Sequence, residues 1–132
     1  MAEAALAARL RGRALDVTVE SAGIAALVGR PADPLAQEVV SERGLDISAH
    51  RARQLTPELI KAFELVLVMD AEQQRAVESM SPSARGRVHR LGRWSDFDVP
   101  DPYRRGRPAF DRAYELIERG VDDLENAFWR RR

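Results

Sequence analysis

The sequence predicts an α/β protein, a three-layer sandwich in which helices cover both faces of a central parallel sheet. Segments with helical spacing alternate with short β-branched segments, which is the pattern of strands joined by crossover helices. The run at 65–69 is continuously apolar, as expected for a strand that is buried on both faces. A chain of 132 residues, 45% of them hydrophobic, suits one domain over 1–132 and is short for two.

The first half of the chain is expected to hold two helices and one strand. Residues 2–13 place two leucines four apart among alanines, which indicates a helix. Residues 17–22 alternate β-branched and polar side chains, which indicates a strand. Asp33, followed by a proline and an apolar stripe, begins a second helix that ends at Gly44. No strand precedes the first helix, so the strand that normally opens such a unit is absent from the sequence.

The second half continues the alternation and ends in a long helix. Between its last strand and its last helix, residues 94–107 are rich in Asp, Pro and Arg and are expected to form a loop. Residues 125–132 are expected to be a frayed basic tail. The predicted elements are a short helix at 57–63, the strand at 65–69, a helix capped by Asp70, a strand at 88–91 and a helix over 108–128.

Composition and charge exclude several classes of function. The 21 basic and 21 acidic residues cancel, so we expect no nucleic-acid partner. No apolar run approaches the roughly 20 residues that cross a bilayer, so we expect no membrane insertion and a cytoplasmic location. The sequence has no cysteine, and His50 and His89 lie far apart, so no disulfide, metal site or cofactor is implied.

The most informative loop for chemistry holds Asp101 between two prolines. The prolines keep the backbone stiff and extended, so this carboxylate cannot enter a helix or a sheet, which suits a positioned general acid. Tyr103, two residues on, offers a ring face to an aromatic substrate. A Pro-Asp-Pro sequence is also ordinary turn chemistry, so the pattern by itself leaves both interpretations open.

Two further candidates are polar residues near the ends of predicted elements. His50 opens a cluster with Arg51 and Arg53, which can bind phosphate or pair with acidic neighbours. Ser21 lies at the end of the first predicted strand. Serine and histidine at such positions are also commonly structural, so both interpretations stay open. No glycine-rich nucleotide loop, metal motif or Ser-His-Asp pattern is present.

Six segments together resemble the low-molecular-weight protein tyrosine phosphatases, and they occur in the order seen in that family. The resemblance runs from Met1 to about Leu124 and is closest to the bacterial subgroup that accompanies capsule and exopolysaccharide tyrosine kinases. The segments are Met1-Ala-Glu-Ala, Glu20-Ser-Ala-Gly23, Val28-Gly-Arg-Pro-Ala-Asp-Pro34, His50-Arg-Ala-Arg-Gln54, Leu67-Val-Met-Asp70 and Pro100-Asp-Pro-Tyr103.

The resemblance implies hydrolysis of phosphotyrosine through a cysteinyl-phosphate. A thiolate at a helix N-terminus attacks phosphorus, and an aspartic acid protonates the leaving phenol. By this resemblance Asp101 is the general acid, and Tyr103 and Leu27 line opposite sides of the substrate slot. Ser21 and His50 match residues that support the phosphate-binding loop through hydrogen bonds. The implied partner is a phosphotyrosine protein, a bacterial tyrosine kinase of polysaccharide synthesis or export.

The sequence departs from the family at its start. The family's phosphate-binding loop, Cys-x5-Arg-Ser-Pro, directly precedes a helix that opens much like Met1-Ala-Glu-Ala. The nucleophile, the phosphate-binding arginine and the first, central strand are therefore absent from these residues, and we expect negligible activity from them alone. The strands on either side of the absent one would lack a partner, so we also expect self-association through unpaired edges.

Two hypotheses account for this departure. In the first, the enzyme is longer and Met1 is an internal methionine. In the second, the chain is a truncated, non-catalytic relative that binds a protein. Protein arginine phosphatase is a lower-ranked activity, because Tyr103 favours an aryl phosphate. Arsenate reductase ranks low because its redox relay needs further cysteines.

Overall fold

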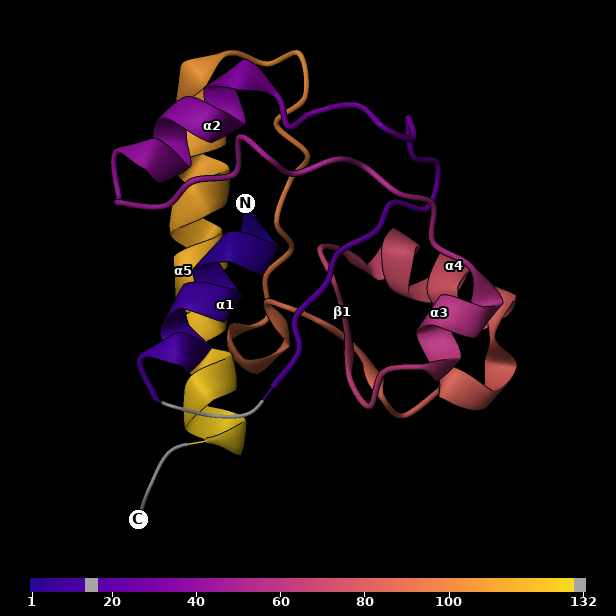
Figure 1. Cartoon of the computed structure of the whole chain (residues 1–132). Coiled ribbons are helices and arrows are strands. Elements are labelled where there is room, and N and C mark those ends of the chain that lie inside the picture. Colours follow the sequence, from indigo (N-terminus) through magenta and orange to yellow (C-terminus); the bar gives the residue numbers. More distant parts are fainter. Residues whose placement is uncertain (14–16, 130–132) are drawn as a thin grey trace.

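The computed structural model describes residues 1–13 and 17–129 and confirms the predicted α/β class. Two strands pair in parallel, with Val66 opposite Val88 (Figure 1). In chain order the elements are α1 (Ala2–Arg11), α2 (Pro34–Ser41), α3 (Pro57–Lys61), β1 (Val66–Val68), α4 (Ala71–Met80), the 3-10 helix η1 (Pro82–Ala84), β2 (Val88–Arg90), the 3-10 helix η2 (Arg93–Ser95) and α5 (Arg107–Phe128).

The sheet separates two apolar clusters, which makes the three layers of the predicted sandwich. Val66 and Val68 pack with buried residues of α3 and α4. Leu67 and Met69, which point the opposite way along the pleat, pack against the cluster formed by α1, α2 and α5. Figure 1 shows α1, α2 and α5 on one side of β1 and α3 and α4 on the other. Both faces of β1 are therefore covered, as its continuously apolar sequence predicts.

Helix starts are fixed by side chains that the sequence identifies. Asp33 accepts a hydrogen bond from the backbone N–H two residues further on, at 2.8 Å, and begins α2. Asp70 accepts from Gln73 N at 2.8 Å, and the Gln73 side chain accepts from Met69 N at 2.8 Å. This reciprocal pair satisfies two backbone donors at the point where β1 passes into α4.

The strand predicted over 17–22 is not present, and this prediction is wrong. In the part of the chain that the structure describes, residues 17–22 make no backbone–backbone hydrogen bond. The next residue, Gly23, forms an isolated parallel bridge with Gln54, and Val17 is 43% exposed. An alternating pattern favours an extended backbone, but a strand also needs a hydrogen-bonded neighbour along its length, and the described residues offer one only at Gly23.

The C-terminal helix α5 ends at Phe128, where the spacing of its apolar residues predicts, and so it includes part of the predicted frayed tail. Residues 125–128, which the sequence analysis placed in a frayed tail, belong to α5. Arg9 and Arg13 of the N-terminal segment both reach Glu125, with N–O distances of 2.9 and 3.1 Å. These ion pairs hold the last turns of α5 against α1. Residues 130–132 lie outside the described residues.

Within the described ranges, no helix has the length and apolar character needed to cross a bilayer.

Candidate active site

Asp101 lies on a loop that leaves the sheet at the carboxyl end of β1. The loop is attached there because Val99 N donates to the Met69 carbonyl at 2.8 Å. Asp101 is exposed, and one of its carboxylate oxygens accepts a hydrogen bond from Tyr103 N at 3.0 Å. This Asx turn fixes the direction of the carboxylate on the loop. Ligands of parallel α/β folds bind beyond the carboxyl ends of the strands, which is where this acid lies.

Tyr103 presents its ring on the same loop. The residue is 52% exposed, and the Arg104 guanidinium lies 5.2 Å from the ring centroid. A backbone hydrogen bond from Arg105 N to Pro102 O, at 2.9 Å, closes the turn. Arg104 has a φ of 62°, a left-handed conformation that reverses the chain within this turn. The result is a carboxylate and an aromatic ring on one tight turn, both open to a substrate.

The segment that leads into this loop is held by a close backbone approach and by two ion pairs. A Cβ at Gly92 would lie 2.0 Å from the Phe97 carbonyl oxygen, so only glycine fits at this position. Arg90 contacts Asp98 at 2.9 Å and Asp96 at 3.0 Å. The hydrogen bonds to Asp98 and Asp96 raise the pKa of the Arg90 guanidinium. Arg90 ends β2, so the sheet and the acid-bearing loop are joined by these contacts.

Leu27, the second predicted wall, lies on a loop that is organised by one side chain. Leu27 and Val28 are 61% and 68% exposed. The Gln54 amide donates to Ile24 O at 2.6 Å and accepts from Ala26 N at 3.1 Å. No role for Gln54 was predicted from the sequence. In the sequence, Gln54 is marked only by its place at the end of the His50–Gln54 motif. The turn that its side chain spans lies more than 25 residues away along the chain, so the sequence does not indicate this contact.

Backbone pairing completes the support of the Leu27 loop. Gly29 N donates to Ala52 O at 2.8 Å, and Ala52 N donates to Arg30 O at 2.9 Å. The segments 27–31 and 51–54 therefore run side by side. No hydrogen bond or ion pair joins this pair of segments to the Asp101 loop in the described residues, so each wall is positioned by its own supports.

Ser21 and His50 occupy different environments. The Ser21 hydroxyl donates to Glu3 Oε1 at 2.5 Å, which places it against the first turn of α1. His50 lies in a turn where its backbone N–H donates a hydrogen bond to Ile47 O at 3.1 Å. No hydrogen bond to the His50 ring occurs in the described part of the chain. Ser21 thus lies beside a helix N-terminus, where a phosphate loop needs support, while the structure leaves the predicted role of His50 open.

Metal-ligating side chains do not gather in the described residues. No group of three or more histidine, cysteine, aspartate or glutamate side chains with the geometry to hold a metal ion occurs in residues 1–13 and 17–129.

The arrangement of Asp101 and Tyr103 indicates which chemistry the site can carry out. An exposed carboxylate beside an aromatic ring, at the carboxyl end of a parallel strand, suits proton transfer to an aromatic leaving group. The model of the family "Low molecular weight phosphotyrosine protein phosphatase" matches residues 1–131. The chain belongs to this family, as its motifs predict.

Individual relatives agree with the family match. The chain is 50% identical over 122 residues to a Ralstonia nicotianae protein named as a probable low molecular weight protein-tyrosine-phosphatase, EpsP, covering 92% of this chain and 81% of the relative. It is 42% identical over 106 residues to the low molecular weight protein-tyrosine-phosphatase Wzb of Salmonella typhimurium, covering 80% of this chain and 71% of that protein.

Solved structures share the fold. Vibrio vulnificus Wzb in complex with benzylphosphonate superposes with a TM-score of 0.89 at 37% identity, covering 96% of this chain and 88% of that one. The Erwinia amylovora tyrosine phosphatase AmsI superposes with a TM-score of 0.90 at 33% identity, covering 98% and 83% of the two chains.

Proposed function

We propose that this chain supplies the general acid and the substrate walls of a phosphotyrosine phosphatase. The observation that carries the proposal is the turn that holds the Asp101 carboxylate next to the exposed Tyr103 ring. A phenolate is a poor leaving group unless its oxygen gains a proton as the P–O bond breaks. In the proposed site, Asp101 gives this proton while the phenol ring lies between Tyr103 and Leu27.

The nucleophile in this proposal is a cysteine outside these residues, because the 132-residue sequence has none. Its thiolate attacks phosphorus, the bond to the phenol oxygen breaks, and water then releases phosphate from the cysteinyl-phosphate. An arginine and loop amides of the same segment hold the phosphoryl oxygens. Neither Asp101 nor an exposed arginine replaces a nucleophile and a preorganised cradle, so the 132 residues alone are expected to be inactive.

The proposed substrate is a phosphotyrosine protein, and specifically a bacterial tyrosine kinase of polysaccharide synthesis or export. The motif resemblance to the capsule and exopolysaccharide subgroup supports this assignment, and the exposed Tyr103 ring supports an aryl phosphate over phosphoarginine. Tyrosine kinases use ATP, which is made inside the cell, so we place the reaction in the cytoplasm.

A fusion protein tests the proposal. An N-terminal segment carrying a strand and a Cys-x5-Arg-Ser-Pro loop is fused to Met1, and hydrolysis of a phosphotyrosine peptide is compared with that by the 132-residue chain. We expect vanadate-sensitive turnover from the fusion and none above background from the chain alone. Equal turnover by the two proteins, or an inactive but folded fusion, would contradict the proposal.

The role of Asp101 is tested within the fusion. Asp101→Asn keeps the shape of the side chain but removes its proton, so kcat should fall by about 10²- to 10⁴-fold. Asp46 provides a matched control, because it also accepts the N–H two residues further on, at 2.8 Å, and lies on another loop. Asp46→Asn should change kcat by less than about twofold. A similar loss in both variants would refute the assignment of Asp101.

A non-catalytic binding module is the second candidate, and the cysteine-free sequence is the observation that favours it. The intact mass of the protein purified from its source cells distinguishes the two candidates. A protein heavier than this chain by more than a kilodalton supports the enzyme. A mass equal to that of these 132 residues supports the binding module.

A further inference from the structure

Residues 100–106, which carry Asp101, are joined to the rest of the molecule at their two ends. Among the described residues, the side chains of 100–106 form no ion pair. Their hydrogen bonds stay within the loop, apart from one that α5 donates to the Gly106 carbonyl. At the first end, Val99 N is bonded to the end of β1 at 2.8 Å. The position of the Asp101 carboxylate therefore depends on what holds the second end.

The second end is held by Arg107, the first residue of α5. Each of its three guanidinium nitrogens contacts a different carboxylate. Nη2 lies 2.7 Å from Glu42 Oε1, and Nη1 lies 3.7 Å from Glu38 Oε1. Nε lies 3.1 Å from Asp111 Oδ1, one turn further along α5. Glu38 belongs to α2 and Glu42 directly follows it, so Arg107 ties the beginning of α5 to the end of α2.

The stability of α5 by itself does not explain an arginine at this position. The N-terminus of a helix carries a partial positive charge and favours acidic residues, but the first turn of α5 has none, and Arg104 and Arg105 lie just before it. The pair with Asp111 also runs in the less favourable order, because pairs four residues apart are stronger when the acid comes first. The contacts with α2 therefore account better for Arg107 than helix formation does.

Gly106 makes the contacts of Arg107 important for the loop. Its φ is 86°, a conformation that residues with a Cβ rarely adopt. A Cβ placed there would have no atom within 4 Å beyond its chain neighbours, so packing does not restrain the backbone at this point. The direction in which the loop leaves α5 therefore has to be fixed from the helix side, by the residue next to Gly106.

We propose that Arg107 is a positioning residue for the general acid, an inference that rests on the function proposed for Asp101. Its guanidinium holds the second end of the loop against α2, so that the carboxylate stays where the leaving phenol oxygen needs a proton. Because α2 follows the Leu27 loop, the same contacts place the acid and the opposite wall relative to one helix. Proton transfer tolerates little displacement, since misplacing reacting groups by about 1 Å can lower a rate about 100-fold.

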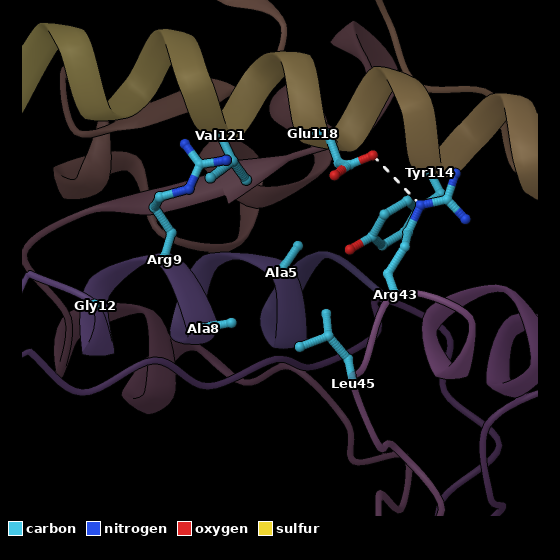
Figure 2. A pocket seen from close by; sticks show the side chains of 9 residues that line it. All are labelled: Ala5, Ala8, Arg9, Gly12, Arg43, Leu45, Tyr114, Glu118 and Val121. Atoms are coloured by element: carbon cyan, nitrogen blue, oxygen red, sulfur yellow. Dashed lines mark ion pairs between the residues drawn. The ribbon is translucent and has the colours of Figure 1, made fainter.

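The first test compares Arg107→Met with Arg43→Met in the fusion protein. Arg43 also joins the end of α2 to α5, through Glu118 at 3.5 Å, but forms no hydrogen bond or ion pair with residues 100–106 (Figure 2). Arg107→Met should lower kcat about tenfold for phenyl phosphate and less than about twofold for 4-nitrophenyl phosphate, whose acidic phenol leaves without a proton. Arg43→Met should lower neither rate by more than about twofold. Equal losses on the two substrates in Arg107→Met would overturn the proposal, because they would indicate a structural role alone.

A double variant shows whether Arg107 acts through Asp101. Once the acid is removed, its position no longer matters, so adding Arg107→Met to Asp101→Asn should lower kcat further by less than about twofold. An equal loss with and without the acid would overturn the proposal and leave the role of Asp101 intact. An Asp101→Asn fusion as active as the unaltered one would overturn the proposed function as well.

A second variant and a second measurement keep the proposal testable apart from Arg107 and from turnover. Glu42→Gln leaves the loop and α5 unaltered and should lower kcat for phenyl phosphate about threefold. In the 132-residue chain, the NMR order parameter of the Tyr103 amide should fall by about 0.1 or more in Arg107→Met and stay the same in Arg43→Met. An unchanged order parameter in Arg107→Met, or an unchanged rate in Glu42→Gln, would overturn the proposal.

Discussion

Replacing Gly92 with alanine is expected to destabilise the segment that leads into the acid-bearing loop. The added Cβ would lie 2.0 Å from the Phe97 carbonyl oxygen and 2.7 Å from Phe97 Cδ1. Non-bonded atoms prefer separations of about 3.5 Å, so the Phe97 carbonyl must move away from residue 92 by more than about 1 Å. The φ of Gly92 is −85°, which alanine adopts freely, so the whole penalty comes from this contact.

The magnitude follows from what holds Phe97 in place. Phe97 N donates to Gly92 O at 3.1 Å, and an Arg90 guanidinium nitrogen donates to Phe97 O at 3.3 Å. Overpacking commonly costs about 1–3 kcal/mol, and a lost hydrogen bond costs about 1 kcal/mol. Gly92→Ala should therefore lower the free energy of unfolding by about 2–4 kcal/mol.

Urea denaturation measures this change, and Gly12 supplies a matched control. Gly12 has a φ of −63°, and the nearest atom to a Cβ added there is 3.4 Å away. Gly12→Ala should change the free energy of unfolding by less than about 1 kcal/mol. The urea midpoint of Gly92→Ala should fall by about 1 M or more. Two midpoints that agree within error would refute the reasoning, because they would mean that the loop absorbs the methyl group at no cost.

Three further predictions follow from the same contacts. In the active fusion, the rate loss in Asp101→Asn should be larger for a phenyl phosphate than for an aryl phosphate with a more acidic phenol, because the acidic phenol leaves without a proton; equal losses would contradict general-acid catalysis. Gln54→Ala removes the hydrogen bond to Ala26 N, so hydrogen exchange of that amide should become about tenfold faster, and unchanged exchange would mean that Gln54 does not hold the loop. Burial, and then the charge of Arg93, lowers the pKa of His89, so its NMR titration midpoint should lie below 6.5. The unfolded chain then binds this proton more tightly than the folded one, so His89 makes stability rise with pH through the window below 6.5, and a midpoint at or above 6.5 would contradict this sign.

Signals that act over a few residues were predictable from the sequence. Asp33 and Asp70 cap helices with bonds to N–H groups two and three residues further on, so no knowledge of the fold was needed to find them. The spacing that predicted a helix over 108–128 reflects one buried stripe of α5, which begins one residue earlier. The strand β1 lies within the apolar run at 65–69. A run of this kind was predictable as a strand because a strand covered on both faces is apolar along its whole length.

Features that depend on distant partners were not predictable. Residues 17–22 have the composition of a strand, but pairing depends on a neighbour that the pattern does not encode. The contacts of Arg90 with Asp96 and Asp98 and the span of Gln54 across a remote turn exist only in the folded chain.

The two loops of the candidate site differ in what supports them, and this difference has a functional consequence. The Asp101 loop is tied to the sheet through Val99 and follows a segment in which Gly92 and Phe97 are in direct backbone contact. The Leu27 loop is held by the Gln54 amide and by backbone pairing with residues 51–54, through hydrogen bonds each worth about 0.5–1.5 kcal/mol. In the proposed site, a transferring proton demands a fixed donor at Asp101, while a substrate wall at Leu27 tolerates displacement. Adaptation to substrates of different shape should therefore occur at Leu27, with Asp101 kept in one place.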